Sequence, residues 1–183
     1  MSLRFPIALM LSIACLVAPA WADLKAGMDA ANRGDYATAL REWRPLAEEG
    51  NAGAQFNLGL HYYNGQGVPQ DYVLARQWWE KAAAQAHVAA QLSLGTLYVY
   101  GYGVPKDNQQ AIRWFRLAAD QGDALAQVKL GVMYERGDGI PQDYVQAYKW
   151  YSLSGANGEK EAIKIRDVLA KRMTSAQIAE AQN

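Results

Sequence analysis

A string of glycine, proline and aspartate returns at a fixed interval in this sequence, and this repetition constrains the fold more than any other feature. Gly65–Asp71 reads Gly-Gln-Gly-Val-Pro-Gln-Asp, and similar strings stand at Gly101–Asp107 and Gly137–Asp143, each 36 residues after the last. An Ala-Gln-x-x-Leu-Gly-x-x-Tyr string precedes every copy at the same distance. Repetition at periods of about 20 to 50 residues is typical of solenoids and related arrays. The sequence therefore predicts a stack of similar units.

Within each unit, the periodicity of the apolar residues predicts two helices separated by a turn. Ala54, Leu58 and Tyr62 fall on one face of the first helix at intervals of four residues. Gly65 is expected to end this helix, because glycine adopts the left-handed conformation readily, and Asp71 is expected to cap the next helix. We therefore expect an all-α fold, an α-solenoid of about eight to ten helices with no sheet.

Glycines and tryptophans that recur in phase are assigned to packing. Gly59 and Gly95 stand inside first helices, where a glycine costs about 1 kcal/mol relative to alanine. Close approach of a second helix explains why this cost is accepted. The second helices carry tryptophans in phase, and the same packing role is predicted for Trp78, Trp114 and Trp150.

The repeats divide the chain into six segments. Residues 1–22 form a predicted signal peptide, and residues 23–53 form a partial N-terminal repeat. Full repeats are expected over residues 54–89, 90–125 and 126–161, followed by degenerate capping helices over residues 162–183. Within the last segment, Thr174 and Gln177 have the spacing of a capping box, which predicts a short final helix. Atypical terminal repeats are expected of an array that presents polar ends.

The N-terminal segment indicates export. Phe5–Val17 is an apolar run of the length found in signal peptides, and Ala20 and Ala22 supply the small residues of a cleavage site before Asp23. Two alternatives are a membrane anchor, for which the run is short against the roughly 20 residues of a span, and a lipoprotein modified at Cys15. Because Cys15 is the single cysteine, the exported chain would have none. We expect a periplasmic or secreted protein.

Composition and motifs give no indication of an enzyme. Eighteen basic residues balance eighteen acidic ones, which argues against nucleic-acid binding through bulk charge. Hydrophobic residues make up 51% of the chain, enough for a packed core. The sequence shows no serine, cysteine or phosphate-loop motif, so we assign no catalytic residue, cofactor or metal site. Of the two histidines, His61 is assigned to packing and His87 to solvent.

These strings resemble the Sel-one-like repeat (SLR) family of the tetratricopeptide superfamily, over roughly residues 23 to 172. The hallmark string runs from Ala54 to Asp71 and is followed by Ala75 and Trp78. The resemblance implies a right-handed superhelix of antiparallel helix pairs and a non-enzymatic adaptor that binds a protein or peptide. One exported branch, with a cysteine pair in each repeat, is linked to binding or hydrolysing β-lactams. That activity is the alternative function, and the missing cysteines argue against it.

The same resemblance points to a binding surface. First helices line the concave side of tetratricopeptide-like solenoids, and here the face opposite the core stripe changes from apolar and aromatic to charged along the axis. Whether Phe56 and Leu60 are exposed or buried between repeats is left open, whereas Asn64, Tyr100 and Arg136 are expected to be exposed. The candidate partner-binding residues are Phe56, Asn57, Leu60, Tyr63, Asn64, Thr96, Tyr100, Lys129, Glu135 and Arg136.

Overall fold

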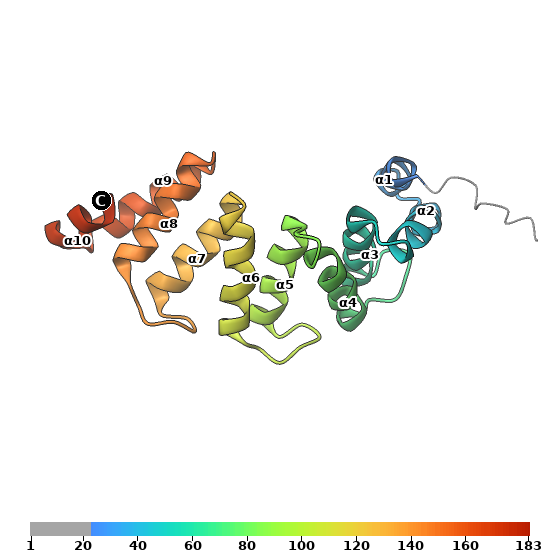
Figure 1. Ribbon diagram of the computed structural model, residues 1–183, viewed down its shortest axis with the longest axis horizontal. Coiled ribbons are helices and arrows are strands. Elements are labelled where there is room, and N and C mark those ends of the chain that lie inside the picture. Colours follow the sequence, from blue (N-terminus) through green and yellow to red (C-terminus); the bar gives the residue numbers. More distant parts are fainter. Residues whose placement is uncertain (1–22) are drawn as a thin grey trace, which may run out of the picture.

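The computed structural model describes residues 23–183 as ten helices that follow one another along an arc (Figure 1). Within this range there is no strand, so the expected all-α solenoid is confirmed. The expected signal peptide, residues 1–22, lies outside the described residues. The helices are α1 (Leu24–Asn32), α2 (Tyr36–Glu48), α3 (Ala52–Asn64), α4 (Tyr72–Ala83), α5 (Val88–Tyr100), α6 (Asn108–Asp120), α7 (Ala124–Arg136), α8 (Tyr144–Ala156), α9 (Lys160–Ala170) and α10 (Ser175–Gln182).

From α1 to α9, each helix packs on its neighbours along the chain, with the closest association inside the pairs α3–α4, α5–α6 and α7–α8, whereas α10 packs on α8. The turn between the helices of a pair forms as its residues predict. Gly65 ends α3 at φ 68°, in the left-handed region. The carboxylate of Asp71 accepts hydrogen bonds of 2.9 Å from the backbone N–H groups of Val73 and Leu74, which caps α4.

Glycines inside the first helices allow an aromatic ring to lie against the backbone. A Cβ atom on Gly59 would lie 2.4 Å from the ring of Trp79, and one on Gly95 would lie 2.4 Å from the ring of Phe115. Phe115 is only 1% exposed. The packing role predicted for these two glycines is confirmed.

The packing role predicted for Trp78, Trp114 and Trp150 is confirmed, although none of the three is fully enclosed. Trp78, Trp114 and Trp150 are half-buried, whereas the next residue in each second helix is buried. Successive helical residues point about 100° apart, so the two positions face different neighbours. Trp79 faces the glycine of its own first helix, whereas Trp78 packs at the margin of a core cluster built from α1, α2 and α3.

Buried glutamines link each pair to the preceding one, a role that the sequence analysis did not assign. The side-chain amide of Gln55 donates to the carbonyl of Ala47 at 3.0 Å, and its carbonyl accepts from the amide of Gln85 at 2.9 Å. Gln91 and Gln127 make the equivalent bonds in the next two pairs. Each glutamine therefore joins the start of a first helix to the end of the second helix before it.

The second glycine of each turn contacts the preceding pair at its other end. A Cβ atom on Gly67 would lie 2.7 Å from Tyr36, and one on Gly103 would lie 2.8 Å from Tyr72. Both glycines have positive φ, at 73° and 67°. Tyr36 and Tyr72 are the first residues of α2 and α4. The turn thus lies directly on the start of a second helix, where a side chain would collide.

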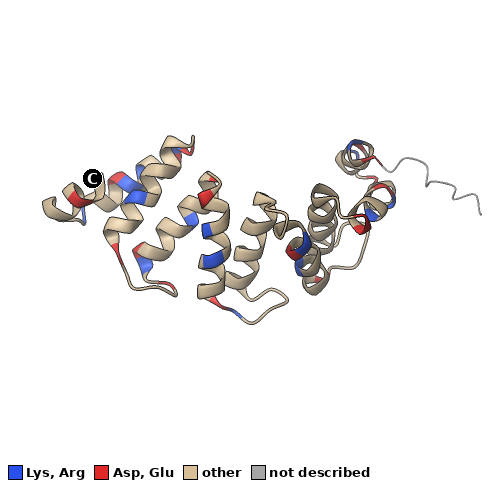
Figure 2. Cartoon of the chain, viewed as in Figure 1, with Lys and Arg blue, Asp and Glu red and all other residues tan. Residues whose placement is uncertain are grey.

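The two ends of the arc differ from its centre. At the N-terminus, α1 and α2 keep the glycine–aromatic contact through Gly27 and Trp43, but a short loop replaces the Gly-x-Gly turn. At the C-terminus, Thr174 and Gln177 form the predicted capping box of α10. Figure 2 shows acidic and basic residues distributed along the whole arc. No helix within residues 23–183 combines the length and the apolar character needed to cross a bilayer.

Candidate partner-binding face

Side chains of α3, α5 and α7, together with a few from α4, α6 and the turns, line two adjoining hollows on one face of the arc, which we call the first-helix face. The first hollow has a volume of about 220 Å³ and is lined by Tyr63, Trp79, Leu92, Ser93, Thr96, Leu125 and Lys129. The second has a volume of about 470 Å³. Leu125 and Lys129 line both, so the hollows meet at α7. The structure thereby brings together three predicted residues, Tyr63, Thr96 and Lys129.

The second hollow combines an apolar floor with a charged margin. Its apolar lining consists of Val99, Phe115, Leu125, Val128, Val132 and Met133. Tyr100, which is 59% exposed, lines the same hollow together with Arg136, as both were expected to be exposed. Lys106, Lys129 and Asp138 supply the remaining charges, and Asn108 completes the lining. Such a surface offers hydrophobic contact and orienting polar groups together, as binding clefts do.

Beside the hollows, tyrosines form a continuous aromatic cluster. The ring of Tyr63 lies 5.2 Å from that of Tyr72 and 6.2 Å from that of Tyr102. Tyr102 stacks on Tyr72 at 4.9 Å and on Tyr100 at 5.5 Å. Burial, together with the neighbouring tyrosines, raises the pKa of the Tyr63 hydroxyl. That hydroxyl therefore stays protonated at neutral pH and can donate a hydrogen bond.

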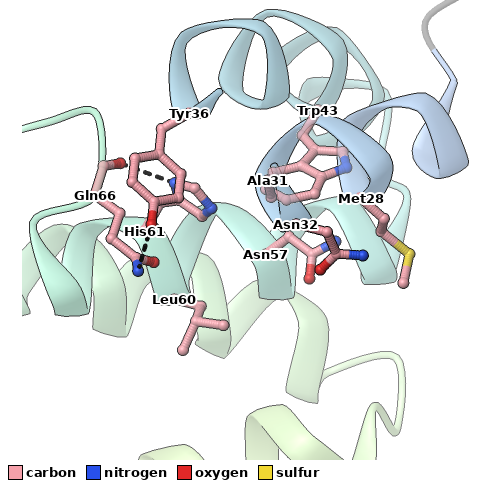
Figure 3. A pocket seen from close by; sticks show the side chains of 9 residues that line it. All are labelled: Met28, Ala31, Asn32, Tyr36, Trp43, Asn57, Leu60, His61 and Gln66. Carbon is pink, nitrogen blue, oxygen red and sulfur yellow. Dashed lines mark hydrogen bonds between the residues drawn. The ribbon is translucent and has the colours of Figure 1, made fainter. Parts of the chain in front are cut away.

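A third hollow, of about 290 Å³, lies between α1, α2 and α3 (Figure 3). Asn57 and Leu60 line it, and Leu60 is 36% exposed. Figure 3 shows the carboxamide of Asn57, from α3, beside that of Asn32, from α1. The lining is completed by Met28, Ala31, Tyr36, Trp43, His61 and Gln66. Among the described residues, the lining therefore consists of apolar, amide, hydroxyl and aromatic groups.

His61 packs within that third hollow, as predicted. It is 3% exposed, and its ring meets Tyr36 and Trp43 edge-on at 5.3 and 5.1 Å. Its Nδ1 atom lies 2.8 Å from the carbonyl oxygen of Gln66. Because a carbonyl only accepts, Nδ1 carries the proton in this bond. Burial lowers the pKa of His61, which favours the neutral ring.

His87 is not the solvated residue that the sequence suggested. It is half-buried, stacks on Phe56 at 4.9 Å and accepts a 3.3 Å hydrogen bond from the backbone N–H of Ala90. The N-cap position of α5 explains the difference, because His87 stands where Asn51 and Asp123 cap α3 and α7. Burial lowers its pKa as well.

Three predicted residues lie apart from the hollows. Phe56 is half-buried, with its ring against His87 and Trp79, so it packs between repeats. Asn64 is exposed but lines none of the three hollows. The carboxylate of Glu135 accepts a hydrogen bond from Tyr151 at 2.9 Å and pairs with Arg172 at 2.7 Å. Glu135 therefore ties α7 to α8 and to the C-terminal cap.

Several lining residues were not anticipated, among them Leu125 and Lys106. Leu125 stands near the start of α7 and is exposed, and an apolar side chain at a helix start was the only available signal. Lys106 replaces a glutamine found at the same place in the other two turns, Gln70 and Gln142. That departure from the repeat was visible in the sequence. Within residues 23–183, no group of three or more His, Cys, Asp or Glu side chains is arranged to hold a metal ion.

Two solved structures resemble this chain along most of its described length. The crystal structure of a Sel1 repeat protein from Oxalobacter formigenes shares 31% sequence identity, covers 76% of this chain and 58% of its own, and has a TM-score of 0.73. A protective antigen present in uropathogenic Escherichia coli strains, displaying an SLR fold, shares 38% identity over 77% of this chain and 32% of its own, with a TM-score of 0.70. The chain spans less than two thirds of either relative.

A family model gives the same result at the level of the repeat. The Sel1 repeat model matches residues 52–87, 88–123 and 124–159, together more than half of the chain. Among curated proteins, none matches the sequence significantly. The chain belongs to the Sel1 repeat family, whose members are helical-repeat scaffolds for protein interactions.

Proposed function

We propose that this protein is a non-enzymatic scaffold that binds a protein or peptide partner on the first-helix face, as the concave side of the solenoid. The observation that carries the proposal is the pair of adjoining hollows across α3, α5 and α7. Equivalent positions in their lining differ between repeats, as Ser93 and Lys129 illustrate, whereas the glycines that pack against the second helices recur. A variable surface on a constant framework is how repeat proteins acquire specific partners.

Site-specific photo-crosslinking in cells tests this proposal. A photoreactive amino acid at Thr96 or Tyr100 would sit at the hollows, whereas one at Arg113 or Gln109 would sit on exposed parts of α6 in the same repeat. We expect discrete adducts with another protein from the first two positions and none from the control positions. Adducts confined to α6, or absent from all four positions, would contradict the proposal.

The place of action is proposed to be the periplasm or the extracellular space. Support comes from the apolar run Phe5–Val17 and the Ala20–Ala22 cleavage pattern. Mass spectrometry of the protein isolated from cells should give a chain that starts at Asp23. A chain that still contains residues 1–22, or one that carries a lipid on Cys15, would contradict export by this route.

The alternative function, β-lactam binding or hydrolysis, finds no support in residues 23–183, which contain no cysteine. Purified protein should give no sustained turnover of a chromogenic β-lactam. Turnover that disappears with a substitution on the first-helix face would instead favour an enzyme.

A further inference from the structure

We infer that the second hollow, between α5 and α7, selects an acidic peptide segment that carries a bulky apolar side chain. The inference rests on the proposed function and adds the chemistry of the partner. It starts from the charges of the hollow, which contains Lys106, Lys129 and Arg136 against the single carboxylate of Asp138. The whole chain is neutral, with eighteen basic and eighteen acidic residues, so this local excess is not a general property of the surface.

The three cations have no anionic partner within the described part of the chain. The ion pairs there involve Lys25, Arg41, Arg76, Lys164, Arg166 and Arg172. Glu135, which precedes Arg136 in the sequence, is engaged by Tyr151 and Arg172. Lys129 is half-buried and lies where both hollows meet. A carboxylate from a partner would therefore find these cations available.

Lys106 shows that the positive charge is not required by the scaffold. In the other two turns, the side-chain amides of Gln70 and Gln142 donate 2.8 Å hydrogen bonds to the carbonyls of Tyr63 and Glu135, near the ends of α3 and α7. The middle turn has lysine instead and lacks this side-chain bond. The repeat thus gives up a structural contact at the one place where the side chain borders the second hollow.

The free energies of the possible contacts indicate that ion pairs alone would not bind a partner tightly. An exposed ion pair contributes about 0–1 kcal/mol, and Arg136 also has the ordinary role of a basic residue in the last turn of a helix. Burying one large apolar side chain contributes about 1.5–3 kcal/mol. The apolar floor supplies such a site, and Tyr100 is well placed to cover it. The apolar side chain would provide affinity, while the cations favour acidic neighbours over basic ones.

Selection from random peptides displayed on phage, with the purified protein as bait, tests the inference. We expect the enriched sequences to place Asp or Glu within a few residues of a large apolar side chain. A synthetic peptide from that selection should bind less tightly as salt is raised. It should also lose about tenfold or more in affinity for the variant Lys106→Gln, Lys129→Gln, Arg136→Gln.

A matched variant removes the same charge elsewhere. Arg113, Lys149 and Lys171 are exposed, line none of the hollows and take part in none of the ion pairs. Their joint replacement by glutamine should leave peptide affinity unchanged, and both variants should melt as the parent does. Lys106→Gln recreates the residue of the other turns, so loss of folding is not expected there.

The outcomes separate this inference from the proposed function. Enrichment of neutral or basic sequences, or equal affinity for both triple variants, would overturn the acidic partner while leaving a peptide-binding first-helix face intact. Enrichment of no sequence, together with absent crosslinks from Thr96 and Tyr100, would overturn both.

Discussion

The two sides of the first helices differ in how closely their residues repeat. On the side that faces the second helix, Gly59, Gly95 and Gly131 recur without change, and each meets an aromatic ring. On the first-helix face, Asn57 gives way to Ser93 and then to Lys129 in equivalent places. Both sides belong to the same three helices. The difference shows that glycine recurs where no side chain fits, although the buried ring packed on it changes from Trp79 to Phe115 and Tyr151. Positions that border a hollow are free to differ.

Removal of a ring from the side that faces the second helix, the enclosed side, should have the largest effect on stability. Phe115→Ala should lower the free energy of unfolding by about 3–5 kcal/mol, because the ring is buried against Gly95. Trp114→Ala removes a larger but half-buried side chain and should cost less. Urea denaturation of both variants provides the measurement. A larger loss for Trp114→Ala would contradict the assignment of the buried position.

A single added methyl group should distinguish the two sides of α5. Gly95→Ala places a Cβ atom 2.4 Å from the ring of Phe115, and such overpacking typically costs about 1–3 kcal/mol. The control is Ser93→Ala, on the first-helix face of the same helix, which should change stability by less than about 0.5 kcal/mol. Similar thermal midpoints for the two variants would show that the glycine is not a packing requirement.

The contact between repeats can be tested through a buried amide. Gln91→Leu deletes the bonds to the carbonyl of Ala83 and to the side chain of Gln121. The carbonyl of Ala83 keeps the N–H of Ala86 as a donor, so the loss of stability should be that of the two hydrogen bonds, about 0.5–1.5 kcal/mol each. Gln121→Ala leaves the buried side-chain oxygen of Gln91 without its donor, which costs about 1–3 kcal/mol, so it should destabilise to a similar extent although Gln121 itself is exposed. Unchanged stability of both variants in denaturation experiments would show that this amide does not hold the repeats together.

Stability should fall modestly with acidification, through a histidine on the enclosed side. Burial lowers the pKa of His61 below its ordinary 6.5, so the unfolded chain takes up the proton first. The stabilising effect is complete above that ordinary value and is lost as pH falls from it through the folded-state pKa. Thermal melting between about pH 7.5 and 5.5 should show the decline.

The residue found at the equivalent place in the next repeat supplies the control for this pH effect. His61→Leu copies Leu97 and should flatten the pH dependence. His87, whose pKa burial also lowers, accounts for any remainder, so a second variant at that position is needed. An unchanged slope in the double variant would show that neither histidine is responsible.

The smallest effect on stability is expected on the first-helix face. Replacement of Tyr100 and Arg136 by alanine should change the free energy of unfolding by no more than about 0.5 kcal/mol per residue, because both side chains are exposed. Partner binding should nevertheless weaken, since tyrosine and arginine often dominate interface energetics. A variant that melts and binds as the parent does would show that the second hollow is not used.

The sequence predicted the helical framework well because its determinants are local. Glycine at a helix end and aspartate before the next helix act within a few residues, and both Gly65 and Asp71 do so as expected. That Trp79 is more deeply buried than Trp78 was not predicted, because it depends on the rotation of one helix against another. The engagement of Glu135 by Arg172 joins residues far apart in the sequence, and no periodic pattern reports such a contact.

Neighbouring helix pairs contact each other at two separate points, and this affects how a partner binds. Gln55 holds one end of the contact between α2 and α3, and Gly67 fits against the other end. Two contacts restrict both the separation and the rotation of one helix pair relative to the next. We therefore expect the hollows to keep their width without a bound partner. The entropic cost of association then falls on the partner, which favours segments that are already ordered before they arrive.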